Sequence, residues 1–380
     1  MDFLLSGFFE ITWQQLVMYC VGGLLIYLAV AKGFEPALLL PMGFGAILVN
    51  IPLSGVLNQN IAGIGNTQGI IDWLFHTTIE QSEALPILLF IGIGAMIDFG
   101  PLLSNPKMFL FGGAAQFGIF FTILVACILG FRLEDAASIG IIGAADGPTS
   151  ILVSQILKSD YMGPIAVAAY SYMALVPIIQ PLAVKLVTTK KERMIRMEYN
   201  PQSVTKFTRL VFPIVVTLIA GLIAPMSVSL VGFLMFGNLI RECGELGSLS
   251  ETAQNALANL ITLLLGITIS FSMQAKAFVN WQTLMIMALG LVAFVFDSIG
   301  GVMFAKLLNL FLKKKINPMV GAAGISAFPM SARVIQKMGL KEDPSNHLLM
   351  HAISANVAGQ IGSVVAGGVV IKIVLEIIAR

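Results

Sequence analysis

An acidic side chain lies inside an apolar stretch of this chain that glycine and proline interrupt, GAADGPTSI at residues 143–151. Ionised groups at bilayer depth are costly and are kept where an ion, a proton or a partner meets them. Sodium prefers about five or six hard oxygen ligands, including carboxylates, hydroxyls and backbone carbonyls. We therefore predict that Asp146 supplies the charge of a sodium or proton site, with Thr149 and Ser150 as neutral ligands.

A second broken stretch, NPMVGAAGISAFPMSAR at residues 317–333, contains further groups of this kind. Asn317 and Ser326 offer an amide and a hydroxyl to a cation, and Arg333 has the paired donors that bind a carboxylate. Structural alternatives stay open for three of these residues. Asp146 and Asn317 suit helix N-caps before prolines, and Arg333 suits an arginine that extends to the membrane interface.

Other polar residues within apolar segments are weaker candidates. Tyr172, in AVAAYSYMALVP, has a hydroxyl that can donate a proton or touch an ion, although most buried tyrosines simply pack. Asn356 in SANVAGQIGS is expected to face the bundle and join the site, and Asp297 in FVFDSIGG is a candidate for a second site. His347 and His351 share a helical face, but without an HExxH motif they predict no metal site.

Membrane helices must position these residues. The chain has 380 residues, of which 57% are hydrophobic and only 11% charged, and its net charge of +2 gives no basis for nucleic-acid binding. Apolar runs of about 20 residues, enough to cross a bilayer, recur along it. The predicted fold class is therefore an all-α polytopic membrane protein. Ten spans are predicted, at 14–31, 35–50, 85–99, 107–130, 163–187, 208–225, 227–241, 254–272, 280–311 and 346–376.

Two further apolar segments, 136–158 and 316–338, contain the broken motifs and are predicted to be re-entrant helical hairpins. With this arrangement most basic residues fall on one side, which the positive-inside rule assigns to the cytoplasm. They are Lys32, Lys107, Lys190, Lys191, Arg193, Arg196, Lys206, Arg241 and Lys313 to Lys315. The acidic loop 51–84 and both termini are expected outside. The exceptions are Arg132, Lys158 and Lys276.

The order of elements repeats across a charged linker. The predicted units are a first repeat at 1–187, the linker at 188–206 and a second repeat at 207–380. ADGPTSILVSQI aligns with SAFPMSARVIQK from residue 326, matching Pro148 with Pro329 and Gln155 with Gln336. Five full spans in each half invert one half relative to the other, as in secondary transporters whose broken helices build an ion site near the midplane. The two hairpin tips are expected to meet there.

Four motifs together resemble a known family across nearly the whole chain. GAADGPTSI, AAYSYMALVPIIQP, NPMVGAAGISAFPMSARV and NHLLMHAISANVAGQIGS are similar to segments of the beta subunits of sodium-translocating biotin-dependent decarboxylases. That family serves oxaloacetate, methylmalonyl-CoA and glutaconyl-CoA decarboxylases. The resemblance implies a subunit of the bacterial cytoplasmic membrane that decarboxylates carboxybiotin, consumes a proton and couples the reaction to sodium export.

The resemblance also implies partners for this chain. They are a carboxyltransferase subunit, a biotin carrier subunit, a small membrane subunit and further copies of the beta subunit. The sequence has no biotinyl-lysine motif of the AMKM type, so the carboxybiotin is expected to arrive on a partner. A stand-alone sodium-coupled carboxylate symporter of similar inverted-repeat design is the alternative, because it too needs a sodium site between broken helices.

The family's functional residues can be carried over by position in the motifs. The resemblance implies that its essential aspartate is Asp146 and its functional tyrosine is Tyr172. Its important Asn, Gly, Ser and Arg residues fall on Asn317, Gly321, Ser326 and Arg333. The expected sodium ligands are Asp146, Asn317, Ser326, Gly321, Thr149 and Asn356. Carboxybiotin is expected near Arg333 and Ser326, with catalytic roles for Asp146, Tyr172 and Arg333.

Overall fold

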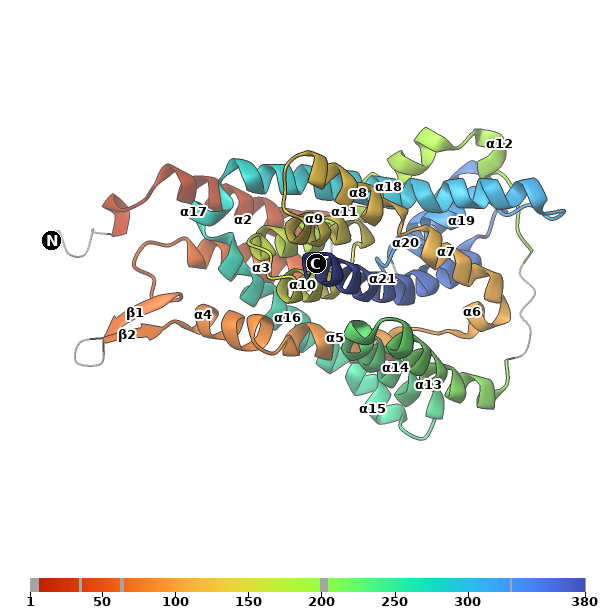
Figure 1. Cartoon of the computed structure of the whole chain (residues 1–380), viewed down its shortest axis with the longest axis horizontal. Coiled ribbons are helices and arrows are strands. Elements are labelled where there is room, and N and C mark those ends of the chain that lie inside the picture. Colours follow the sequence, from red (N-terminus) through yellow and green to blue (C-terminus); the bar gives the residue numbers. More distant parts are fainter. Residues whose placement is uncertain (1–6, 34–35, 62–64, 199–203, 329, 380) are drawn as a thin grey trace.

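The computed structural model describes residues 7–33, 36–61, 65–198, 204–328 and 330–379, and it is almost entirely helical (Figure 1). Pro329, which the repeat alignment pairs with Pro148, lies outside the described residues. Within them, seven helical stretches are long and apolar enough to cross a membrane, and two bent helix pairs raise this number to nine. The predicted class of all-α polytopic membrane protein is therefore confirmed.

The first half of the chain contains more breaks than the predicted spans. Its helices up to the first broken segment are α2 (Trp13–Lys32), α3 (Pro36–Val49), α4 (Ile70–Phe75), η1 (His76–Glu80), α5 (Ala84–Met96), α6 (Gly100–Ser104), η2 (Pro106–Met108), α7 (Phe109–Ala114) and α8 (Phe117–Ile128). α3, with 14 residues, is shorter than the about 20 that a straight crossing needs. The number of ten spans therefore stays a prediction.

The segment 51–84, expected to be a loop, is partly structured. It contains an antiparallel hairpin of β1 (Asn58–Ile61) and β2 (Gly65–Gln68), which the sequence analysis did not predict. It also contains α4 and η1, which form one of the two bent pairs with α5, at an angle of 66°. The apolar residues of IIDWLF favour a helix here. The sequence analysis did not predict this helix because it treated the segment as a loop on account of its acidic residues.

The first broken segment folds back on itself. Its elements are α9 (Leu133–Gly140), the 3-10 turn η3 (Ile141–Ala144) and α10 (Gly147–Ile156). Side chains tie its two ends together: Arg132 forms an ion pair of 2.7 Å with Asp160, and Ser159 donates to the Asp135 carboxylate at 2.8 Å. The chain thus enters and leaves this segment at the same place, as a re-entrant hairpin does.

α11 (Met162–Val187) follows this hairpin and is bent by 74° between Met162–Met173 and Leu175–Val187. Pro177 accounts for the bend, because a proline within a helix lacks the N–H donor and its ring clashes with the carbonyl four residues earlier. That carbonyl belongs to Met173, the last residue of the part of α11 that precedes the bend. The two parts of α11 on either side of the bend are the second of the two bent helix pairs.

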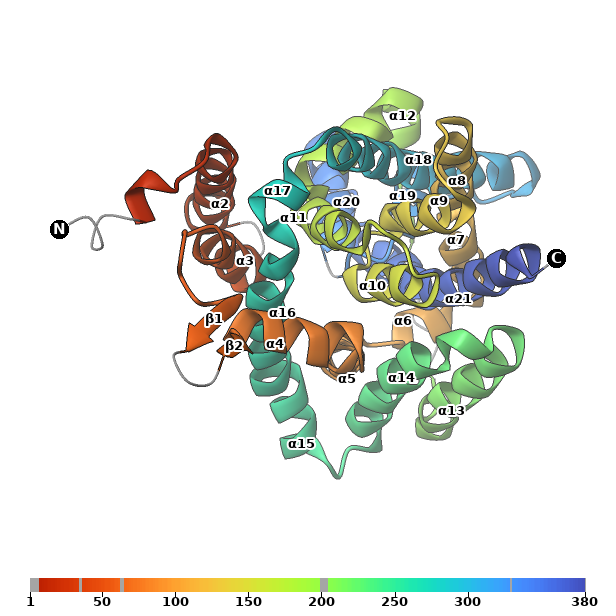
Figure 2. The same ribbon diagram turned by 60° about the vertical axis from the view of Figure 1, so that its left-hand side comes forward.

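The second half contains the remaining helices. They are α12 (Lys190–Arg193) in the linker, then α13 (Lys206–Ile223), η4 (Pro225–Ser227), α14 (Val228–Cys243), α15 (Gly247–Thr252), η5 (Ala253–Leu257), α16 (Ala258–Ile269), η6 (Ser270–Met273), α17 (Ala275–Phe278), α18 (Trp281–Phe311), α19 (Pro318–Ala322), α20 (Met330–Glu342) and α21 (Leu349–Ile378). Figures 1 and 2 both show α10 and α21 in the middle of the molecule, between α18 on one side and α14 on the other.

The second broken segment, α19 with α20, also has its two ends side by side, at the linker. The Asn317 amide donates to the Arg193 carbonyl at 2.9 Å, and the Arg193 guanidinium pairs with Glu342 at 2.7 Å. The linker residue Arg193 therefore holds the start of α19 and the end of α20 together. α12 lies at the end of the molecule away from the β-hairpin (Figure 1).

Candidate functional site

Asp146 is buried at the start of α10, directly after a reversal of the chain. Ala145 has a φ of 52°, in the left-handed region that non-glycine residues rarely adopt, and this conformation turns the chain from η3 into α10. The Asp146 carboxylate accepts hydrogen bonds from the Thr149 hydroxyl at 2.7 Å and the Thr149 amide at 3.4 Å. Asp146 is thus the N-cap of α10, which is the structural role that the sequence analysis gave as the alternative to an ion site.

A third hydrogen bond to this carboxylate comes from α21, more than 200 residues further along the chain. The Ser363 hydroxyl donates to Asp146 Oδ2 at 3.0 Å. On the same helix the Gln360 amide donates to the Ser326 carbonyl. The Asn356 amide donates at 2.6 Å to the carbonyl of Ile325, the residue before Ser326. The spacing of four and then three residues places these side chains on one face of α21. This face contacts both broken segments.

The tips of the two broken segments also contact each other directly. The Ser326 amide donates to the Ala144 carbonyl at 3.0 Å, and the Ser326 hydroxyl donates to the Gly359 carbonyl at 3.0 Å. Ala144 is two residues before Asp146. The structure therefore brings Asp146, Thr149, Ser326 and Asn356 to the junction of the two hairpins with α21.

This junction offers the oxygen atoms that a hard cation takes. The Asp146 carboxylate is 4% exposed, and its Oδ1 accepts only the long bond from the Thr149 amide among the described residues. The Asn356 side-chain oxygen has no hydrogen-bond partner in the described part of the chain. A buried carboxylate flanked by the hydroxyls of Thr149 and Ser363 fits a dehydrated sodium ion better than a softer metal.

Two predicted ligands have other contacts. The Asn317 side chain uses its oxygen to cap α19, accepting from the Met319 amide at 3.0 Å, and its nitrogen to bind linker carbonyls. Gly321 packs against α18, where a Cβ on Gly321 would lie 2.0 Å from the Gly301 carbonyl oxygen. No hydrogen bond among the described residues joins Asn317 or Gly321 to Asp146. The contacts that the structure shows for Asn317 and Gly321 hold the second hairpin in place.

The tyrosine next to Asp146 is not the one that the motif indicated. The Tyr172 hydroxyl donates to the Met287 carbonyl of α18. The ring of Tyr170 lies against Gly147, since a Cβ built there would come within 2.2 Å of a ring carbon. Residues two apart in an α-helix are separated by about 200°, so only one of the two can face Asp146. The Tyr170 hydroxyl is buried without a hydrogen-bond partner in the described residues.

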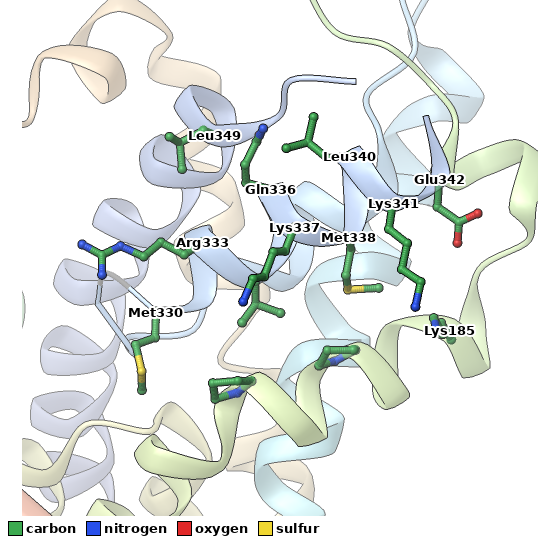
Figure 3. A pocket seen from close by; sticks show the side chains of 13 residues that line it. Lys185, Met330, Arg333, Gln336, Lys337, Met338, Leu340, Lys341, Glu342 and Leu349 are labelled. Atoms are coloured by element: carbon green, nitrogen blue, oxygen red, sulfur yellow. The ribbon is translucent and has the colours of Figure 1, made fainter. Parts of the chain in front are cut away.

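Arg333 lies apart from Asp146, on an exposed face of α20. It lines a groove of about 620 Å³ between α11 and α20 (Figure 3), and it has neither an ion pair nor a hydrogen bond to any described residue. Three lysines share the groove with Arg333, and prolines and methionines supply its apolar walls. These residues are Lys185, Lys337, Lys341, Pro177, Pro181, Met330 and Met338. A basic groove with apolar walls fits an anionic group on a largely apolar ring.

Comparison with known proteins covers almost the full length of the chain. A family model described as the Na⁺-transporting oxaloacetate decarboxylase beta subunit matches residues 14–374. The methylmalonyl-CoA decarboxylase subunit beta of Propionigenium modestum is 47% identical, with 97% of each chain aligned. The glutaconyl-CoA decarboxylase subunit beta of Acidaminococcus fermentans is 48% identical over 97% of this chain and 96% of that protein. A probable oxaloacetate decarboxylase beta chain of Vibrio cholerae is 43% identical over 97% of each chain.

Proposed function

The chain belongs to the family of beta subunits of sodium-transporting decarboxylases, and on this basis we propose that it decarboxylates carboxybiotin presented by a partner and couples the reaction to sodium export. Its membrane would be the bacterial cytoplasmic membrane. The carboxyltransferase subunit, the biotin carrier and a small membrane subunit would complete the complex, with further copies of this chain. Relatives of similar identity are named for different acids, so the acid is chosen outside this chain.

The single observation that carries the proposal is the contact of the two broken segments beside Asp146, through the Ser326 amide and the Ala144 carbonyl. In our proposal the halves 1–187 and 207–380 are inverted repeats, and each contributes one hairpin to the sodium site. Sodium binds to Asp146, to Thr149 and Ser363 on either side of it, and to Asn356. Ser326 and Gln360 hold the second tip against α21, and Asn317 and Gly321 anchor its base.

The coupling follows from the chemistry of one carboxyl group. Decarboxylation breaks the bond between the ureido nitrogen and the carboxylate, and the nitrogen keeps the electron pair and takes up a proton. An ionised Asp146 binds sodium and a protonated Asp146 does not, so proton passage through this site displaces the ion. Moving one charge against about 100 mV costs roughly 2.3 kcal/mol, which the coupled step must supply. Arg333 and its neighbouring lysines would hold the carboxylate of carboxybiotin.

Purification of the native complex tests this function against the symporter alternative. We expect a biotinylated subunit, detected with streptavidin, to co-purify with the chain. Sodium uptake into inverted vesicles should then require the acid that the complex decarboxylates, and it should stop when avidin blocks the biotin. A symporter would instead transport sodium as a purified chain without partners, and that result would contradict the proposal.

Replacing Arg333 separates carboxybiotin handling from sodium binding. Arg333→Lys should slow decarboxylation of carboxybiotin by about tenfold, because lysine lacks the planar donor pair that grips a carboxylate. The sodium concentration for half-maximal activity should not change. Lys191→Arg, a charge-conserving exchange on exposed α12, is the matched control and should behave as wild type. An equal loss of sodium affinity and of carboxybiotin turnover in Arg333→Lys would contradict the assigned role.

A further inference from the structure

A second buried carboxyl group, Asp297 on α18, has no part in the mechanism above. Its side chain is fully buried, and its Oδ1 accepts a hydrogen bond from the Ile119 amide at 3.1 Å. Its Oδ2 is buried too and has no hydrogen-bond partner among the described residues. Because buried polar atoms are nearly always satisfied, an unpartnered carboxyl oxygen in a membrane interior indicates that something else binds it.

Asp297 lies against the same turn that carries Asp146. A Cβ built on Gly143 of η3 would be 2.5 Å from Asp297 Oδ2, and a Cβ on Gly118 of α8 would be 2.6 Å from Oδ1. The backbones of η3 and α8 therefore touch the carboxyl group directly. Gly143 is only three residues before Asp146, so a movement of this turn changes the surroundings of both carboxyl groups.

Among the described residues, no Lys, Arg or His side chain forms an ion pair with Asp297. Of the elements packed against α18, α7, η3 and α19 contain no Asp, Glu, Lys, Arg, His, Cys or Tyr. The other elements packed against α18 contribute these titratable groups: Cys127 on α8, Glu134 and Asp135 at the start of α9, and Tyr170, Tyr172 and Lys185 on α11. α18 itself contains one further titratable group, Lys306, which forms an ion pair of 2.9 Å with Glu192. An unpaired carboxylate in such surroundings costs far more free energy than the neutral acid.

The surroundings also distinguish a proton from a sodium ion. Sodium needs about five or six oxygen ligands, whereas the close contacts that the structure shows at the Asp297 carboxyl group are with the backbone of Gly118 and Gly143. A proton needs no coordination shell. We propose that Asp297 is a proton-binding site of the transport cycle. It holds a proton as the neutral acid and exchanges it when sodium binding at Asp146 moves the 141–146 turn. This inference rests on the proposed function, because sodium at Asp146 drives the exchange.

Infrared difference spectroscopy of the purified chain in lipid, with and without sodium chloride, tests this site without any partner subunit. The carbonyl band of a protonated carboxylic acid should shift when the protein contains ¹³C-labelled aspartate, and its position should change on sodium binding. Asp297→Asn should lose the part of this band that remains in Asp146→Asn. Ser298→Ala, which removes an adjacent buried hydroxyl that also lacks a partner among the described residues, should keep it.

Asp146→Asn distinguishes the two carboxyl groups and makes the test independent of whether Asp297→Asn folds. It should keep the Asp297 band and lose only the response to sodium. Absence of an acid band from labelled aspartate in Asp146→Asn would overturn the proposal, as would persistence of that band when Asp297→Asn is added to Asp146→Asn. A band in the wild type that sodium leaves unchanged would overturn the link to Asp146. Failure of the decarboxylase assay with a sodium-sensitive band present would refute the proposed function alone.

Discussion

Asp146→Asn is expected to abolish decarboxylation and sodium uptake together, each by on the order of a hundredfold or more. Asparagine is as good an N-cap as aspartate, so the bonds from Thr149 that start α10 can persist and the chain should fold. What the exchange removes is the negative charge, which a dehydrated sodium ion needs most at a buried site. The measurement is sodium uptake into inverted vesicles with the partner subunits present, alongside release of CO₂.

The matched control for this prediction is the same exchange at an exposed position. Asp160→Asn removes a carboxylate whose ion pair with Arg132 is largely exposed, and such pairs contribute little to stability. It should retain activity close to that of the wild type. Wild-type decarboxylation by Asp146→Asn, with or without sodium transport, would refute the role of Asp146 in coupling.

Gly321→Ala is expected to destabilise the folded chain by about 1–3 kcal/mol or more, the usual range for overpacking a close contact. The new Cβ would lie 2.0 Å from the Gly301 carbonyl oxygen, and both groups belong to backbone that cannot rotate away. α18 and α19 must therefore separate, and Ser326 would lose its position beside Ala144. The midpoint of thermal unfolding in detergent should fall, and coupled activity should fall with it.

Gly23→Ala is the control, because a Cβ on this α2 glycine meets nothing within 4 Å. Alanine there should be neutral or slightly stabilising, since it restricts the unfolded chain. The experiment also separates two roles for Gly321. A variant with wild-type thermal stability but weakened sodium dependence would favour the ligand role that the family motif implied over the packing role that we infer.

Several features of the site could be predicted because they depend on local chemistry. Clustered glycine and proline favour breaks in membrane helices, so both broken segments were found from composition and spacing alone. The capping alternatives for Asp146 and Asn317 are equally local and are confirmed, since each side chain caps the helix that follows it. Asp146 itself was found because a charge in an apolar segment is rare.

Other features required information that local patterns do not contain. Ser363 and Gln360 were missed, although their spacing from Asn356 marks one face of a helix and was a usable signal. Tyr170 and Tyr172 could not be distinguished, because only the rotation of α11 against its neighbours decides which ring meets Gly147. The β1–β2 hairpin was missed because NQNI and GNTQ lack the apolar alternation that predicts strands.

The sequence by itself determined that this is a helical membrane protein, which segments are broken, which carboxylate is the candidate for the sodium site, and, by resemblance, the family. These properties follow from hydropathy, helix-breaking residues and motif identity, all of which are readable along the chain. Only the tertiary structure decided that α21 joins the two hairpin tips, that Asn317 and Gly321 anchor the second hairpin, and that Asp297 lies against the turn of Asp146. Those contacts depend on how helices approach and rotate against one another, which packing determines.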